Sequence, residues 1–196
     1  RLDRAALMLE VGIEARDARL LDAAGRDLQE MIQAASPDYR PLTRARALAL
    51  CGAGMSALAT LADDPRAAEQ AETLFSGAAA QFTPDHSPLD WAAIQVVKAE
   101  SGTASLMDLA RAETLTAGAG LIVGALSALA KRREETRLAE AGGDLAGLDA
   151  LKGGLVKRLG AGPHALDWAG TQIALAEIAL ARRRLTGEQP RALGLI

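Results

Sequence analysis

Two stretches of the chain repeat one another: residues 89–100 read LDWAAIQVVKAE and residues 166–177 read LDWAGTQIALAE. Seven of the twelve positions are identical, and both tryptophans of the chain, Trp91 and Trp168, occupy the same place in the motif. The two stretches start 77 residues apart, which is about twice the length of a two-helix repeat. This repetition predicts a fold built from repeated helical hairpins.

The composition of the chain points to the same fold class. Among 196 residues there are 44 alanines and 31 leucines, whereas valine and isoleucine together number 12 and aromatic residues make up 3%. Alanine and leucine favour helices, while strands are enriched in β-branched and aromatic residues. We therefore expect an all-α protein without strands.

Apolar residues recur at alternating spacings of three and four in several stretches, and this spacing places them on one face of a helix. Three such stripes stand out, and each predicts a packing face. Their members are Leu21, Ala24, Leu28, Met31 and Ala35; Ala68, Ala71, Phe75, Ala78 and Phe82; and Leu166, Ala169, Ile173, Ala176 and Leu180.

Proline, glycine and capping residues divide the chain into about nine helices. At Asp64-Pro65, for example, a capping aspartate precedes a proline in the first helical turn, which predicts the start of a helix. The expected helices cover residues 2–16, 18–35, 41–62, 65–82, 88–101, 104–117, 120–141, 144–160 and 164–185. Short connections make consecutive helices pack antiparallel. Because no internal linker is evident, we expect a single domain over residues 1–186 with a tail at 187–196. The start at Arg1 rather than Met suggests a fragment of a longer chain.

The motif Pro-Leu-Asp-Trp-Ala-x-x-Gln at residues 88–95, followed by a small-residue helix and a second amphipathic helix, resembles degenerate bacterial tetratricopeptide repeats. Residues 41–45 carry a weaker echo of it. The resemblance implies an α-solenoid of stacked antiparallel hairpins that acts as a non-enzymatic protein-binding scaffold or adaptor. The chain departs from the family seven and eight residues past the Trp, where Leu-Gly is usual: Cys51-Gly52, Lys98-Ala99 and Leu175-Ala176 stand there.

By the same resemblance, fixed positions of each first helix line a concave surface where a partner segment would lie. The candidate partner-binding residues are Arg46, Ala49, Ala53, Val96, Glu100, Ile173, Glu177 and Leu180. The repeated glutamates, Glu100 and Glu177, would favour a basic peptide or helix, although a solvated helix face explains them as well. The apolar ends of such a stack leave an end-to-end homodimer open.

Two other functions remain open. One is a regulatory or sensor domain of a larger signalling protein. The other is a membrane-proximal helical module, because residues 114–130 contain no charge and include Gly120-x-x-x-Gly124. We prefer a buried helix for that stretch, since a membrane span needs about 20 strongly apolar residues.

Residues for catalysis, metal binding or nucleic-acid binding do not converge in the sequence. The net charge is −3, and a nucleic-acid surface needs a basic excess. Cys51 lies among apolar neighbours, and neither His86 nor His164 has a second metal ligand at suitable spacing. We interpret the basic runs 131–133 and 182–184 as solvated helix faces. We expect no enzyme, cofactor or metal. We also expect a cytoplasmic protein, since a lone cysteine cannot form an internal disulfide and so allows a reducing compartment without requiring one.

Overall fold

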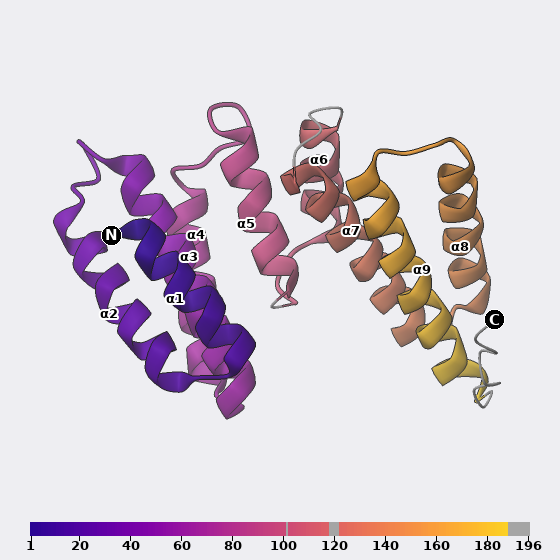
Figure 1. Ribbon diagram of the computed structural model, residues 1–196, viewed down its shortest axis with the longest axis horizontal. Helices are drawn as coiled ribbons and strands as arrows, with labels where there is room; N and C mark the ends of the chain where they lie inside the picture. The colour runs from indigo at the N-terminus through magenta and orange to yellow at the C-terminus, as the bar shows by residue number, and fades with distance from the viewer. Residues whose placement is uncertain (101, 118–121, 188–196) are drawn as a thin grey trace. The chain divides into compact units, whose positions relative to one another are not determined.

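The computed structural model describes residues 1–100, 102–117 and 122–187, and within these ranges the chain forms nine α-helices and no strand (Figure 1). The helices are α1 (Leu2–Ala15), α2 (Ala18–Ala34), α3 (Pro41–Ala62), α4 (Pro65–Ala79), α5 (Pro88–Glu100), α6 (Leu106–Thr116), α7 (Ile122–Ala141), α8 (Leu145–Gly160) and α9 (Ala165–Thr186). The all-α prediction is confirmed, and each helix begins and ends within three residues of its expected bounds.

Side-chain caps explain where several helices begin. Asp64 accepts a hydrogen bond from the backbone N–H of Arg66 at 2.9 Å, with Pro65 as the first residue of α4, as predicted. Asp17, Ser105 and Asp144 do the same for α2, α6 and α8. Each cap satisfies a backbone donor that the first helical turn leaves without a partner.

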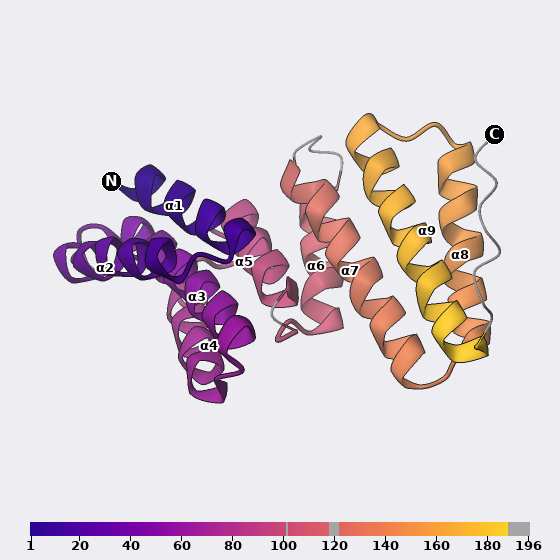
Figure 2. The ribbon, with the colours of Figure 1, turned by 60° about the horizontal axis from the view of Figure 1, so that its bottom comes forward.

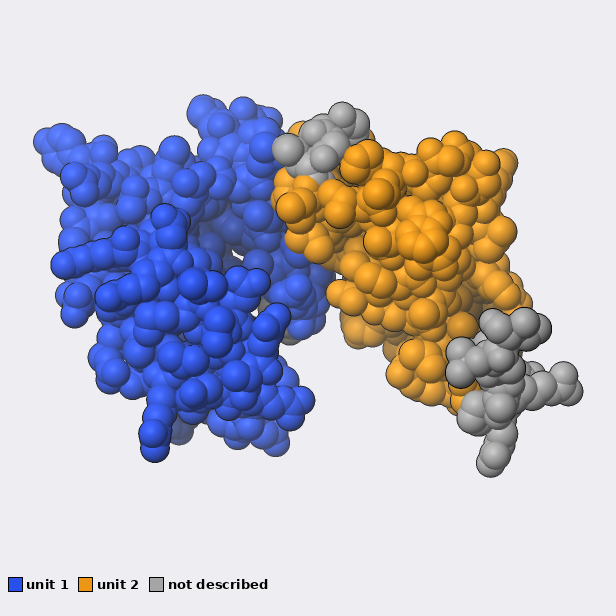
Figure 3. Space-filling model, viewed as in Figure 1, with its two compact units in different colours: residues 1–104 blue, residues 105–196 orange. Residues whose placement is uncertain are grey.

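Residues 1–104 form the first of two compact units (Figure 3). Here α1 pairs with α2, α2 packs on α3, and α3 packs most extensively on α4, which also contacts α5. The core is built from small residues and leucines: Ala5, Leu28, Ala47 and Cys51 form one buried cluster, and Leu9, Leu21 and Ala24 another.

Residues 105–196 form the second unit. Its central helix is α7, which packs against both α6 and α9, while α8 packs on α9 and more lightly on α7. Figure 2 shows α8 and α9 side by side. Leu129, Leu148, Leu155 and Ile178 bring α7, α8 and α9 together in a single buried cluster.

The sequence led us to expect one domain over residues 1–186, and the described residues gather into two compact units instead of one. Compact units of a helical protein can still unfold together, so the single domain stays a prediction. The regular solenoid also stays a prediction.

Two of the three apolar stripes are buried as predicted, except for Ala68 at the start of the second and the half-buried Met31 in the first. The third prediction is wrong. Leu166, Ala169, Ile173, Ala176 and Leu180 are all exposed, and α9 instead packs through its opposite face, whose buried residues are Thr171, Ala174, Ile178 and Ala181. Because alanines lie on both faces of α9, the apolar periodicity of the sequence is compatible with burial of either face.

The charge-free stretch 114–130 does not form one helix in the described residues, because α6 ends at Thr116 and α7 begins at Ile122. Gly120 lies outside the described residues, as do residues 188–196 of the predicted tail. One described helix, α3, is long and apolar enough to cross a membrane by length and composition, a test that core helices of soluble proteins also pass.

The close approach of α3 and α4 depends on the missing side chain of Gly52. A Cβ atom built there would lie 2.8 Å from Cε1 of the buried Phe75, whereas a Cβ at Gly25 in α2 meets nothing within 4 Å. We expect Gly52→Ala to lower the free energy of unfolding by about 1–3 kcal/mol through overpacking. Gly25→Ala should raise it by roughly 0.5–1 kcal/mol, because alanine favours the helix. Urea unfolding of both variants checks this, and a stabilised Gly52→Ala variant would contradict the packing described.

Candidate functional site

The predicted partner-binding residues of the first unit do not share one environment. Arg46 is exposed and its guanidinium pairs with the Asp90 carboxylate of α5 at 3.1 Å. Ala49 and Ala53 are half-buried, and Glu100 is exposed. Val96 is buried, so its side chain is not presented at a surface.

The two copies of the repeated motif also differ in their surroundings. Trp91 is 7% exposed and Gln95 beside it is buried, whereas Trp168 is 53% exposed. The matched Gln172 is exposed too. Identical residues at the start of a helix therefore serve packing in α5 and remain at the surface in α9.

The predicted residues of α9 lie in a more coherent surface. Ile173 and Leu180 are 43% and 47% exposed, and Leu166 is 40% exposed. Together with the exposed Ala169 and Ala176, these residues make an apolar surface that we call the α9 stripe. Glu177 lies at its edge and accepts a hydrogen bond from Arg133 of α7 at 2.8 Å.

A groove of about 820 Å³ runs between α7 and α8 in the second unit. The wall on α8 is formed by small residues, Gly147, Ala150 and Gly154, while Leu138 and Ala139 line the α7 side. Leu151 and Leu155 also line it, and Leu155 belongs to the buried cluster beneath. The groove was not anticipated from sequence, although glycines inside an α-helix are a signal of missing side-chain bulk.

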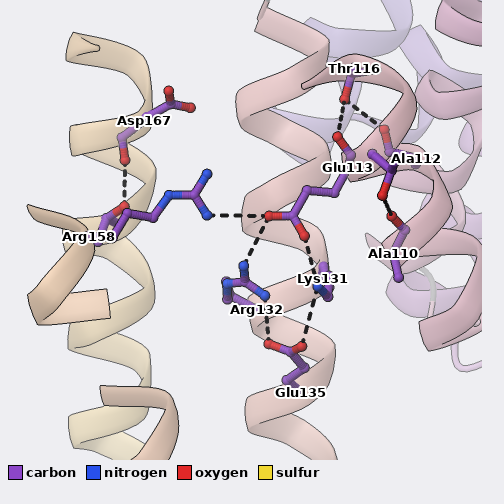
Figure 4. Close-up of polar contacts among 11 residues, drawn as sticks. Ala110, Ala112, Glu113, Thr116, Lys131, Arg132, Glu135, Arg158 and Asp167 are labelled. Carbon is purple, nitrogen blue, oxygen red and sulfur yellow. Dashed lines mark hydrogen bonds and ion pairs between the residues drawn. The ribbon is translucent and has the colours of Figure 1, made fainter. Parts of the chain in front are cut away.

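Five charged side chains form a cluster between α6, α7 and α8 (Figure 4), and three of them, Arg132, Glu135 and Arg158, line one end of this groove. Glu113 of α6 accepts hydrogen bonds from Lys131 at 2.8 Å, Arg132 at 3.0 Å and Arg158 of α8 at 3.4 Å. Glu135 accepts a further bond from Arg132 at 3.0 Å. The expected solvated face at residues 131–133 is therefore wrong for Lys131 and Arg132, which tie α7 to α6.

The charge of Glu113 is stabilised by its neighbours. Burial by itself would raise the pKa of this carboxyl, but the hydrogen bond from Lys131 and the charges of Arg132 and Lys131 outweigh burial, and the pKa is lowered. Opposite charges at this distance favour the ionised form. Glu113 is thus an ionised hub that joins α6, α7 and α8.

The cysteine and the two histidines of the chain are each buried or hydrogen-bonded within the fold. Cys51 is buried, and burial raises the pKa of its thiol, which disfavours the nucleophilic thiolate. His164 begins α9, where its Nδ1 accepts from the backbone N–H of Leu166 at 3.4 Å, and His86 bonds to the Thr83 hydroxyl at 3.1 Å. Among the described residues, no group of three or more His, Cys, Asp or Glu could hold a metal ion.

The lowered pKa of Glu113 predicts a pH-dependent contribution to stability. This contribution is fully present above the unfolded-state pKa of about 4.3 and is lost as the pH falls through the lower folded-state pKa. Glu113→Gln should cost about 1–3 kcal/mol at pH 7, and its difference from the wild type should shrink below about pH 4. Urea unfolding across pH 3–7 measures both, with the exposed Glu10→Gln as control. A difference that does not vary with pH would contradict the ionised hub.

Known proteins give no further guide to these surfaces. No protein-family model, no curated protein and no solved structure matches the chain. The resemblance to tetratricopeptide repeats therefore rests on the repeated sequence motif and stays a prediction.

Proposed function

We propose that the chain is a non-enzymatic protein-binding module, a scaffold or adaptor, that holds a partner segment on the α9 stripe. The observation that carries this proposal is the exposed apolar face of α9. Single exposed apolar residues are normal in folded proteins. Leu166, Ile173 and Leu180 instead follow each other at intervals of seven residues along one helix, which places them on one continuous surface.

The spacing suits a helical partner. Residues seven apart, with the small Ala169 and Ala176 between them, resemble one half of a helix–helix seam, in which a second helix packs along the apolar positions. Alanine at the intermediate positions lets that helix approach closely. An amphipathic helix with bulky apolar anchors at matching intervals is therefore the partner that we expect.

The edges of the stripe are polar, as is the rim of a typical protein interface. Arg133 and Glu177 form an ion pair on one side, and Arg184 pairs with Glu140 at 3.1 Å near the C-terminal end of α9. Because Glu177 is already paired, we do not expect it to attract a basic partner strongly. The apolar centre of the stripe, around Ile173, should carry most of the binding energy.

The test places the same new charge at two neighbouring positions. Ile173→Glu puts a carboxylate in the centre of the stripe, whereas Gln172→Glu puts it one residue away, outside the stripe. Both side chains are exposed, so the free energy of unfolding should change by no more than about 0.5 kcal/mol. The readout is affinity capture from source lysate with quantitative mass spectrometry.

We expect a partner that the wild type and Gln172→Glu capture equally and that Ile173→Glu captures at least about tenfold less, as is typical for the loss of a central anchor. Circular dichroism of both variants establishes that the fold is intact. Capture that is indifferent to Ile173→Glu, or the absence of any captured partner, would contradict the proposal.

A further inference from the structure

We propose that the groove between α7 and α8 is a second docking site, and that its occupant is an acidic amphipathic helix of a partner protein whose carboxylate pairs with Arg158. This site is separate from the α9 stripe, since no residue of the stripe lines the groove. The inference therefore does not depend on the proposed function of α9.

The groove has the size and lining of a binding site. Its volume of about 820 Å³ lies in the range of about 300–1,000 Å³ that is common for ligand sites. A Cβ atom built at Gly154 would meet nothing within 4 Å, so no side chain fills the groove next to the α8 backbone at this position. Leu138 on the opposite wall is 45% exposed, and it offers apolar surface to whatever enters.

The charges at the end of the groove are not balanced. The cluster contains three cations, Lys131, Arg132 and Arg158, against two carboxylates, Glu113 and Glu135, and so carries one excess positive charge. Within the described residues, Asp144 also lines the groove, but it caps the start of α8 at the other end. Asp167 of α9 lines two other cavities with Arg158 but not this groove, so the excess positive charge within the groove lies at the end where α8 finishes.

Arg158 is the cation that can accept another partner. Its side chain is 44% exposed, compared with 18% for Arg132, and its contact with Glu113 at 3.4 Å is the longest hydrogen bond of Glu113 with a cation. That bond uses one nitrogen of a guanidinium that has five N–H donors. A carboxylate is a favoured acceptor for the remaining donors, because it matches the planar fork of arginine.

These two features together select the occupant. An apolar wall along the groove requires apolar side chains on one face of the partner, and the excess positive charge requires a carboxylate at one end of that face. An amphipathic helix with a terminal Asp or Glu meets both requirements. A nucleic acid does not, because its evenly spaced phosphates would lie beside Asp144 at the far end of the groove as well as beside Arg158, whereas the helix carries its carboxylate at one end only.

The experiment selects displayed 16-residue amphipathic helical peptides on the full chain. Gly154→Leu fills the groove, whereas Gly153→Leu adds the same side chain at an exposed neighbouring position of α8 that does not line the groove and where a Cβ also meets nothing within 4 Å. Peptides that lose at least tenfold in affinity with Gly154→Leu and none with Gly153→Leu are bound in the groove.

We expect these groove-bound peptides to be enriched in Asp or Glu at one end of their apolar face and to bind Arg158→Gln five- to thirtyfold more weakly. Replacing that peptide acid by its amide should cost the same factor on the wild type and almost nothing on Arg158→Gln. This coupling separates a direct ion pair from a general structural effect of the variant.

Groove-bound peptides without acid enrichment, or with equal affinity for Arg158→Gln, would overturn the pairing with Arg158 while leaving the groove as a site. Selection of no peptide that depends on Gly154 would overturn the docking site itself. Both results would leave the capture experiment on Ile173 unaffected.

Discussion

Both units depend on close packing between helices whose contact faces consist largely of alanine. A helix whose packing face is largely alanine can approach a neighbour closely, but each residue then removes little apolar area from water. Stability must come from many close helix contacts rather than from a few large side chains. The approach of Gly52 to Phe75 in the first unit is the extreme case, in which a helix backbone lies directly on an aromatic ring. The few large buried residues, such as Phe82 and Leu148, supply the area that alanine does not.

The high alanine content makes the helices easy to predict from the sequence, but it makes the buried face of each helix harder to predict. In α2 leucines on one side oppose charges on the other, and in α4 Phe75 marks the apolar side, so the buried side could be named in advance. In α9, Ala169 and Ala176 lie on the outer face while Ala174 and Ala181 lie on the inner one, and the periodicity is equal for both. Packing against α7 and α8 determines which face of α9 is buried, and the sequence of α9 alone carries no information about that packing.

The candidate surfaces show the same limit. Ile173 and Leu180 were named from a family resemblance and lie at the surface, whereas Val96, named by the same rule, is buried. The Glu113 cluster was not predicted, because Glu113 and Arg158 are 45 residues apart in the chain and meet only when α6, α7 and α8 have packed. Local spacing could have suggested the pairing of Arg132 with Glu135, three residues on, but it could not have supplied Glu113.

The glycines of α8 have a consequence for motion as well as for shape. Gly153 and Gly154 lie in the interior of this helix, where a Cβ would meet nothing within 4 Å, and each costs roughly 0.5–1 kcal/mol of helix stability relative to alanine. Because α8 also has only α9 as an extensive neighbour, its backbone amides should exchange with solvent through local opening well before those of α7. The α8 wall of the groove is then less rigid than the α7 wall, and it can adjust its position to an occupant and become ordered by it.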